Sequence, residues 1–530
     1  MEKKKTSFIQ GAAVLGAAGI LVKIIGAAFR IPLANAIGLI GTSYYDTAYP
    51  YYSWLLVIST SGLPTAISKM VAERVTLGDY RGAHRVFTTA LQILLGIGVI
   101  TALLMFFGAD YLAKLHLLPE VAYSFRALAP ALFFVSLMCA YRGYLQGMQQ
   151  MAPTALSQVV EQVGKLVIGL GLAILLLPKG PEYAAMGALI GVTSSELLAL
   201  FYIMLAYRRR WPRIRARMER SRRTEDKPVA KRLLALALPI TIGASISPLA
   251  SVVDSALIIR ILLKLGYEKE TAQTAFSLMR TNVATLTNMP GVLTMALAMS
   301  LVPAISAFMA KRDKAGMQSV ARMGLKLALI IGLPCAVGLF ILAGPVLSML
   351  YPKLSPAELQ LATDLMHTSA IGVIFLSLVQ SMTGVIQGMG KPHVPVFNLF
   401  IGFILKVVTQ LVLMNIPEVN IQGASVSTVV CYAFAGIADT IYVIRKAKLS
   451  LSMFDVLLKP LLSSAMMGFV VYMLGQLMAE AEHASLSTLF SVAVGVFAYA
   501  VMAVYLRFFS REELEYIPGG AKIKRLMYRD

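Results

Sequence analysis

Residues Tyr144-Leu145-Gln146-Gly147-Met148 return as Val385-Ile386-Gln387-Gly388-Met389, at an offset of 241 positions. Each stretch stands at the end of a long apolar segment. The same offset of 241 relates Lys165 to Lys406, and each lysine lies in the middle of the apolar segment that follows. Two matches at one offset predict that the chain contains an internal repeat.

A third pair of stretches supports the repeat. Pro64-Thr65-Ala66-Ile67-Ser68 resembles Pro303-Ala304-Ile305-Ser306. Counted in apolar segments, the partners of all three matches are six segments apart, and they occur in the same order. An even separation gives both halves the same orientation in a membrane, which predicts a parallel repeat about an axis along the membrane normal.

The composition predicts a polytopic membrane protein. Of the 530 residues, 58% are hydrophobic and 14% are charged, whereas a soluble chain is about 45–50% apolar and about 25% charged. With about 20 apolar residues per crossing, the chain accommodates fourteen transmembrane helices. Such a chain is too apolar for a nucleic-acid-binding protein despite its net charge of +21, and we expect no nucleic-acid partner.

The positive charges predict the topology. Of the 48 Lys and Arg residues, 36 fall in segments that face the cytoplasm if the N-terminus is inside, 5 in outer loops and 7 inside the spans. This asymmetry follows the positive-inside rule and predicts that both termini are cytoplasmic. The fold class is therefore predicted as all-α, with two six-helix bundles and two extra C-terminal helices around a central cavity. The predicted parts are residues 1–207 (first bundle), 208–232 (basic cytoplasmic linker), 233–446 (second bundle), 447–506 (extra helices) and 507–530 (basic cytoplasmic tail).

The sequence contains no signature of an enzyme or a metal site. The three cysteines are far apart within apolar runs, and the five histidines have no metal-ligand spacing around them. No P-loop is present, which argues against an ATP-driven pump in this chain. We therefore expect a transporter with no enzymatic activity, no cofactor and no resident metal.

Charged residues inside the predicted spans are the candidate functional groups, because they are costly in a bilayer. The cations outnumber the deeply placed acids, which indicates a cavity that binds an anion. We assign this role to Lys23, Arg30, Lys165, Arg280 and Lys406. Arg126 and Arg260 lie near outer ends, where snorkelling is the simpler explanation. The acidic residues in or near the predicted spans are Asp46, Glu161, Glu196, Asp254, Asp364 and Asp439.

Two alternatives stay open for these residues. Glu161 stands one helical turn before Lys165 and could neutralise it in a local ion pair. Asp254 and Asn398 are candidates for a site that binds a coupling ion, Na⁺ or H⁺, but such polar groups also form hydrogen bonds between membrane helices.

Several motifs resemble one family of transporters. Phe8-Ile9-Gln10-Gly11 through Arg30-Ile31-Pro32-Leu33, Gly62-Leu63-Pro64-Thr65-Ala66-Ile67-Ser68-Lys69 and Ser300-Leu301-Val302-Pro303-Ala304-Ile305-Ser306 are similar to the polysaccharide-biosynthesis and stage V sporulation protein B group. That group belongs to the MOP exporter superfamily and includes MurJ-type lipid II flippases. The similarity covers essentially the whole chain.

The resemblance implies a flippase of the bacterial cytoplasmic membrane. It implies that undecaprenyl-diphosphate-linked peptidoglycan precursor (lipid II), used in cell-wall biogenesis and cell shape, moves from the inner to the outer leaflet by alternating access. Membrane lipids and cell-wall synthesis proteins are the partners it implies. In the family, basic residues on spans 1, 2 and 8 hold the diphosphate. Arg30 and Arg280 match two of these basic residues in position and type, and Lys23 lies one residue from the position of another. Span 2 has no basic residue between Asp46 and Lys69.

The family's ion site combines an acid on span 7 with an Asn on span 11 and an acid one turn later. Asp254 and Asn398 match the first two, whereas the third position is Gly402. The alternatives are a flippase for another lipid-linked oligosaccharide, for example a capsule precursor, and a drug/cation antiporter related to MATE transporters. A membrane glycosyltransferase is a further alternative, which the short outer loops disfavour.

Overall fold

The computed structural model describes residues 2–221, 228–478 and 484–510, and these residues form helices and no strand. The predicted all-α membrane fold is confirmed. Residues 222–227 of the predicted linker and 511–530 of the predicted tail lie outside the described residues. Contacts between Cα atoms divide the chain into two compact units, Met1–Ser277 and Leu278–Asp530.

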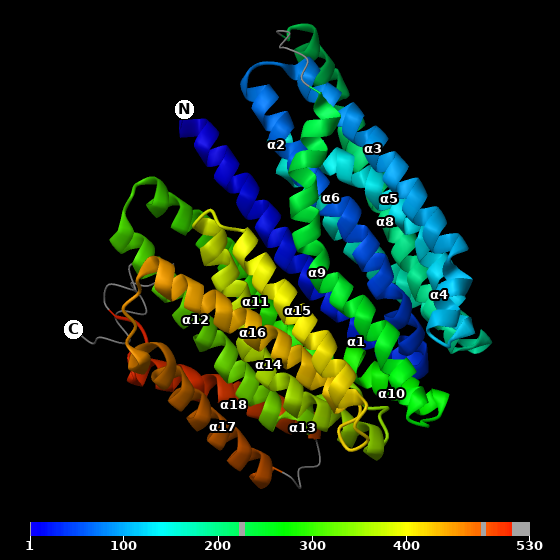
Figure 1. Cartoon of the computed structure of the whole chain (residues 1–530), viewed down its shortest axis with the longest axis vertical. Helices are drawn as coiled ribbons and strands as arrows, with labels where there is room; N and C mark the ends of the chain where they lie inside the picture. Colours follow the sequence, from blue (N-terminus) through cyan, green and yellow to red (C-terminus); the bar gives the residue numbers. More distant parts are fainter. Residues whose placement is uncertain (1, 222–227, 479–483, 511–530) are drawn as a thin grey trace. The chain divides into compact units, whose positions relative to one another are not determined.

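Among the described residues, the first unit contains ten α-helices, and all except α7 are labelled in Figure 1. They are α1 (Glu2–Thr60), α2 (Gly62–Thr76), α3 (Tyr80–Phe107), α4 (Ala109–Leu115), α5 (Ala122–Gly147), α6 (Met151–Gly164), α7 (Leu170–Leu176), α8 (Pro181–Glu219), α9 (Val229–Lys264) and α10 (Lys269–Ser277). Short 3₁₀ segments η1 (Pro119–Val121) and η3 (Leu177–Lys179) and the π-helical segment η2 (Lys165–Gly169) connect some of them.

The second unit has the same all-helical character. Its elements are η4 (Leu278–Val283, π-helical), α11 (Ala284–Ala310), α12 (Lys314–Ile341), α13 (Ala343–Leu350), α14 (Pro356–Gly388), α15 (His393–Met414), α16 (Gln422–Ala447), η5 (Phe454–Leu458, π-helical), α17 (Lys459–Leu477) and α18 (Ala484–Tyr505). The predicted extra pair corresponds to α17 and α18. These helices pack against each other and against α12 and α13 of their own unit.

Among the described residues, thirteen helices or helix pairs are long and apolar enough to cross a membrane. The first of them, Ile24–Thr76, has 53 residues and would be about 80 Å long as a straight helix, against about 30 Å of hydrocarbon. Gly38 interrupts it with a left-handed φ of 71°, which a glycine adopts without a steric penalty. The count of fourteen spans stays a prediction.

The repeated Gln-Gly-Met stretch has a packing role in each unit. A Cβ atom at Gly147 of α5 would lie 2.8 Å from the Ser68 carbonyl oxygen of α2. One at Gly388 of α14 would lie 3.0 Å from the Val302 carbonyl oxygen of α11. In both units the glycine therefore lets two helices approach closely, next to the Ala-Ile-Ser stretch of the facing helix. The repeat in sequence corresponds to the same helix crossing in both units.

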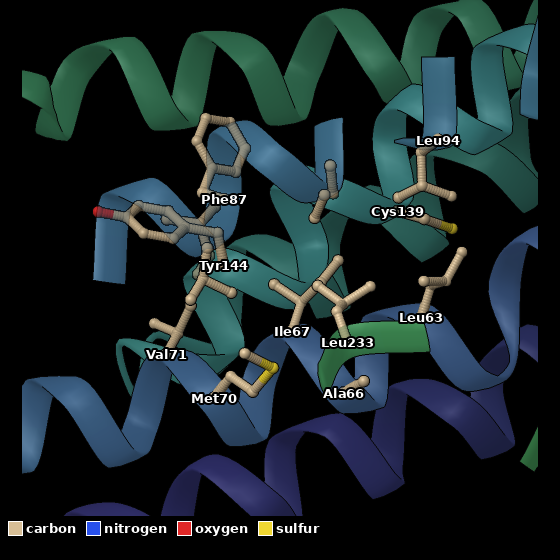
Figure 2. Close-up of a cluster of buried hydrophobic side chains, with 14 of the residues drawn as sticks. Leu63, Ala66, Ile67, Met70, Val71, Phe87, Leu94, Cys139, Tyr144 and Leu233 are labelled. Carbon is tan, nitrogen blue, oxygen red and sulfur yellow. The ribbon is translucent and has the colours of Figure 1, made fainter. Parts of the chain in front are cut away.

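The core of the first unit lies around this crossing (Figure 2). Ile67, Met70 and Val71 of α2 pack with Phe87 of α3 and Tyr144 of α5 in one buried cluster. The basic segment after residue 207 begins as a continuation of α8, and its Trp211 and Ile214 join the same cluster. Part of the predicted linker is thus a helix anchored to the first unit. The helix α9, predicted to open the second bundle, packs against α1 and α2 of the first compact unit.

Candidate functional site

The break in α1 creates a polar region inside the first unit. Thr42 Oγ1 donates hydrogen bonds to the carbonyl oxygens of Gly38 and Leu39, each at 2.9 Å. Ser277 Oγ of α10 donates to the Leu39 carbonyl at 2.6 Å, and Gln273 Nε2 donates to Ser43 Oγ at 2.9 Å. Hydroxyl groups thus satisfy backbone groups that the broken helix leaves open, as a membrane-embedded break requires.

Arg30 lies beside this region and forms an ion pair. Its Nη2 is 2.5 Å from Asp46 Oδ1, and the two side chains are 25% and 1% exposed. The guanidinium carbon is 5.8 Å from the centre of the Tyr45 ring. The charge of the buried Asp46 carboxylate is therefore balanced by an arginine that still reaches open space.

Lys165 is held by aromatic rings. Its Nζ lies 4.6 Å from the centre of the Tyr49 ring and 5.0 Å from that of Phe29, and it donates to Tyr49 Oη at 3.3 Å. Such cation–π contacts stabilise an ammonium group without neutralising it. Among the described residues, no carboxylate lies within ion-pair distance of Lys165. Tyr45 stacks on Tyr49 with ring centres 5.2 Å apart, so Arg30 and Lys165 flank one aromatic stack.

The predicted competitor for Lys165 has another partner. Glu161 Oε2 lies 3.0 Å from Arg142 Nη2 of α5, and Arg142 Nε also donates to Ser157 Oγ at 2.9 Å. Lys165 begins the π-helical segment η2, where a turn takes more residues than in an α-helix. The local Glu161–Lys165 pair therefore does not form. We call Phe29, Arg30, Tyr45, Asp46, Tyr49 and Lys165 the cationic cluster; its two cations exceed its single carboxylate.

The other predicted basic residues are placed as follows. Lys23 is on α1, and its side chain lies outside the described residues. Arg280 is partly buried in the π-helical segment η4, between the buried Met279, Thr281 and Asn282. Lys406 is on α15 and only 3% exposed. Each unit therefore carries basic groups inside its candidate spans, and in the first unit Arg30 and Lys165 come together.

The predicted ion-site residues lie in different units. Asp254 of α9 is buried, with 5% exposure. Asn398 of α15 donates through Nδ2 to Asp439 Oδ1 of α16 at 2.7 Å. Sequence reasoning noted Asp439 without assigning it a partner, because 41 positions separate the two residues. Within the described residues, no cluster of three or more His, Cys, Asp or Glu side chains is arranged to hold a metal.

The aromatic residues around Lys165 were not among those predicted from the sequence. Tyr45, Tyr49 and Tyr52 are spaced by four and three positions, which places them on one face of a helix. That spacing was the available signal. Tyr52 Oη donates to Glu196 Oε1 of α8 at 3.0 Å, so the face also reaches a buried acid.

Membrane-spanning helices and basic side chains held inside them define the class, a multi-pass membrane transporter rather than an enzyme. The family model described as polysaccharide biosynthesis protein matches residues 8–309, more than half of the chain. The chain belongs to this family. A second family model, MatE, matches residues 281–412.

Relatives from Bacillus subtilis (strain 168) cover nearly the whole chain. The uncharacterized membrane protein YabM is 28% identical, over 98% of this chain and 96% of YabM. Stage V sporulation protein B and the lipid II flippase MurJ are each 25% identical, over 97% of this chain and 98% of either relative. The resemblance expected from the motifs is confirmed.

Solved structures show the same fold. The lipid II flippase MurJ in an inward closed conformation superposes with a TM-score of 0.70, at 15% identity, covering 93% of this chain and 99% of that one. An inward-facing multidrug resistance MATE family transporter of the MOP superfamily gives a TM-score of 0.67, at 15% identity, covering 82% and 98%. The chain therefore has the fold shared by these two kinds of transporter.

Proposed function

We propose that the chain is a flippase that moves undecaprenyl-diphosphate-linked peptidoglycan precursor, lipid II, from the inner to the outer leaflet of the bacterial cytoplasmic membrane. The observation that carries the proposal is the environment of Lys165, whose ammonium group lies inside a candidate span and against aromatic rings. Among the described residues, no carboxylate forms an ion pair with it. Full-length similarity to a lipid II flippase supports the same substrate.

The chemistry of the substrate fits the cationic cluster. A diphosphate carries about two negative charges, which are too costly to move through hydrocarbon without compensation. Lys165 and Arg30 offer N–H donors to phosphate oxygens in charge-assisted hydrogen bonds. We assign Lys23, Arg280 and Lys406 to the same task, each unit contributing cations as access alternates. The polyprenyl chain stays in the lipid beside the protein.

The membrane potential supplies a driving force for this movement. A potential that is positive outside favours outward movement of an anion by about 2.3 kcal/mol per charge per 100 mV. A coupling ion, Na⁺ or H⁺, then accompanies the return of the empty carrier. We take Asp254 and Asn398 as the candidates for contacting it, and we propose that both termini face the cytoplasm.

A second candidate function differs only in the sugar. The identity to stage V sporulation protein B equals the identity to MurJ, and that to YabM is slightly higher, which supports another lipid-linked oligosaccharide as the cargo. The cationic cluster would bind the diphosphate of either lipid. A MATE-like exporter of cationic drugs fits less well, because such cargo requires an acidic site.

The test is complementation. Native lipid II flippases are depleted from a bacterium, and translocation of lipid II to the outer leaflet is measured with this chain expressed in their place. We expect rescue by the wild-type chain and by the control Glu219→Gln, whose side chain is 65% exposed, and none by Lys165→Met. Failure of a well-expressed wild-type chain to restore lipid II would contradict the first function, and rescue of capsule export instead would establish the second.

A further inference from the structure

Each half of the repeat carries one deeply buried acid on its sixth apolar segment, residues 183–207 in the first half and 420–444 in the second. Glu196 lies on α8 and is 4% exposed, and Asp439 lies on α16 and is 0% exposed. They are 243 positions apart, close to the offset of 241 that relates Lys165 to Lys406. The two acids thus occupy nearly equivalent places in the repeat.

The two carboxyl groups are also bonded in the same way. Tyr52 Oη donates to Glu196 Oε1 at 3.0 Å, and Asn398 Nδ2 donates to Asp439 Oδ1 at 2.7 Å. The second oxygens, Glu196 Oε2 and Asp439 Oδ2, are buried and have no hydrogen-bond partner among the described residues. A buried carboxylate whose donors are all neutral is costly to ionise, whereas a neutral carboxyl group costs far less.

The charged groups that face Glu196 are occupied elsewhere. Arg142 of α5 pairs with Glu161 of α6, and Lys165 of η2 lies against the rings of the cationic cluster. The titratable neighbours of Glu196 are Tyr52 of α1, Cys139 and Arg142 of α5, Glu161 of α6 and Lys165 of η2. Neither cation forms an ion pair with Glu196 among the described residues.

The surroundings of Asp439 are simpler. The side chains that interact with it are Asn398 of α15 and Thr383 of α14. Both are uncharged, and within the described residues Asp439 forms no ion pair. The helices that pack most extensively against α16 are α14 and α15, and the side chains from them that interact with this carboxyl group are neutral.

The geometry favours a proton over a metal cation as the ligand. A hard cation is usually held by about six oxygen atoms, and no cluster of acids in the described part of the chain supplies them. Tyr52 and Asn398 direct hydrogens, not lone pairs, at the two carboxyl groups. A proton needs only the one oxygen that each carboxyl group leaves open.

We propose that Glu196 and Asp439 are two proton-binding sites, one in each unit, that take up and release a proton during transport. The proposal rests on the proposed transport function and identifies its coupling ion as H⁺. Each carboxylate binds one proton while it is accessible from the outer side of the membrane. It stays neutral while the transporter changes conformation, and it releases the proton to water when its helix exposes it to the cytoplasm. No other bond forms or breaks.

Proton binding is tested first without any lipid substrate. Infrared difference spectra of the reconstituted full chain are recorded as the pH is raised. We expect the C=O band of buried protonated carboxyl groups to diminish in the wild type, to be reduced in Glu196→Gln and in Asp439→Asn, and to be absent in the double variant. The control Glu219→Gln changes an exposed carboxyl group and should leave the band intact. A wild-type band in the double variant would overturn the proposal.

Two further variants keep the test valid if the double variant fails to fold. Tyr52→Phe removes the hydroxyl group that donates to Glu196, and Asn398→Ala removes the amide that donates to Asp439, so the pH dependence of the C=O band should change in each variant. An unshifted band in both variants would also overturn the proposal, because it would show that other carboxyl groups produce the signal.

Coupling is measured separately in liposomes, as translocation of lipid II under a pH gradient with the membrane potential held at zero. A gradient of about one pH unit changes the protonation ratio of a titrating carboxyl about tenfold between the two sides, and we expect a change of up to that size in the wild-type rate. The double variant should lose this dependence. If the infrared band behaves as expected and no lipid moves either at zero potential or with a potential positive outside, the proposed function is wrong and the proton sites stand. If lipid moves and the double variant keeps its pH dependence, the coupling role is wrong.

Discussion

Lys165 Nζ lies 4.6 Å from the centre of the Tyr49 ring, and Tyr49 Oη accepts its hydrogen bond at 3.3 Å. The ring thus positions the ammonium group and leaves its charge available to an anion. Aromatic faces do this better than a carboxylate would, since an ion pair would have to be broken before phosphate could bind.

The first prediction concerns this charge. Lys165→Met should weaken binding of the diphosphate headgroup about 10- to 100-fold, because it removes a charge-assisted hydrogen bond of about 1.5–3 kcal/mol. Lys165→Arg keeps the charge and should retain much of the binding. The measurement is the affinity of the purified protein for a soluble diphosphate-sugar analogue; equal affinities for all three proteins would remove Lys165 from the site.

The second prediction separates folding from function at Arg30 and Asp46. Arg30→Ala removes an ion-pair partner of the buried Asp46 carboxylate and should destabilise the protein by up to about 3 kcal/mol. Asp46→Asn should cost less, because Arg30 is 25% exposed and Asp46 only 1%. Thermal unfolding in detergent measures both effects.

The double variant Arg30→Ala/Asp46→Asn is the control for this pair. It removes both charges, so it should recover part of the stability lost in Arg30→Ala and still translocate lipid poorly. Full recovery of transport would show that Arg30 only neutralises Asp46.

The sequence predicted more of the fold than of the site, for a physical reason. Hydropathy and the repeat are properties of whole helices, and they were sufficient for the all-α membrane fold. The hydrogen bond between Asn398 and Asp439 joins two residues that are 41 positions apart in the sequence and lie on different helices. No local spacing predicts such a contact. Glu161 illustrates the opposite error: its spacing from Lys165 indicated a pair, but the π-helical segment and Arg142 of α5 decided the partner.

The third prediction tests the helix crossing that the repeat encodes. A Cβ atom at Gly147 or Gly388 would come within 2.8 or 3.0 Å of a backbone carbonyl oxygen of the facing helix, so Gly147→Ala and Gly388→Ala should each cost about 1–3 kcal/mol. Gly96→Ala and Gly171→Ala are matched controls, since nothing lies within 4 Å of either Cβ position. Both controls should be neutral or slightly stabilising, because alanine favours helices more than glycine does.

Thermal unfolding of the four glycine variants provides the comparison. If the two control variants were destabilised as much as the two crossing variants, close approach of the helices would not be the reason for the repeated glycine.

The fourth prediction concerns His116, which follows α4 outside the candidate spans and is 1% exposed. Its Nε2 lies 3.0 Å from Tyr51 Oη. Burial lowers the pKa of His116 to about 4, against about 6.5 in an unfolded chain. Between these values the unfolded chain binds the proton more tightly, so stability falls as the pH decreases from about 6.5 toward 4. The full contribution of the neutral ring, at most about 3 kcal/mol, is present above pH 6.5.

Unfolding of the detergent-solubilised protein, followed at several pH values, tests this dependence. His116→Gln cannot take up the proton and should flatten the acid side of the stability profile, although it is less stable than the wild type at neutral pH. His393→Gln, at the exposed start of α15, is the control and should keep the wild-type profile. An equally steep acid loss in His116→Gln would show that His116 is not the source of the pH sensitivity.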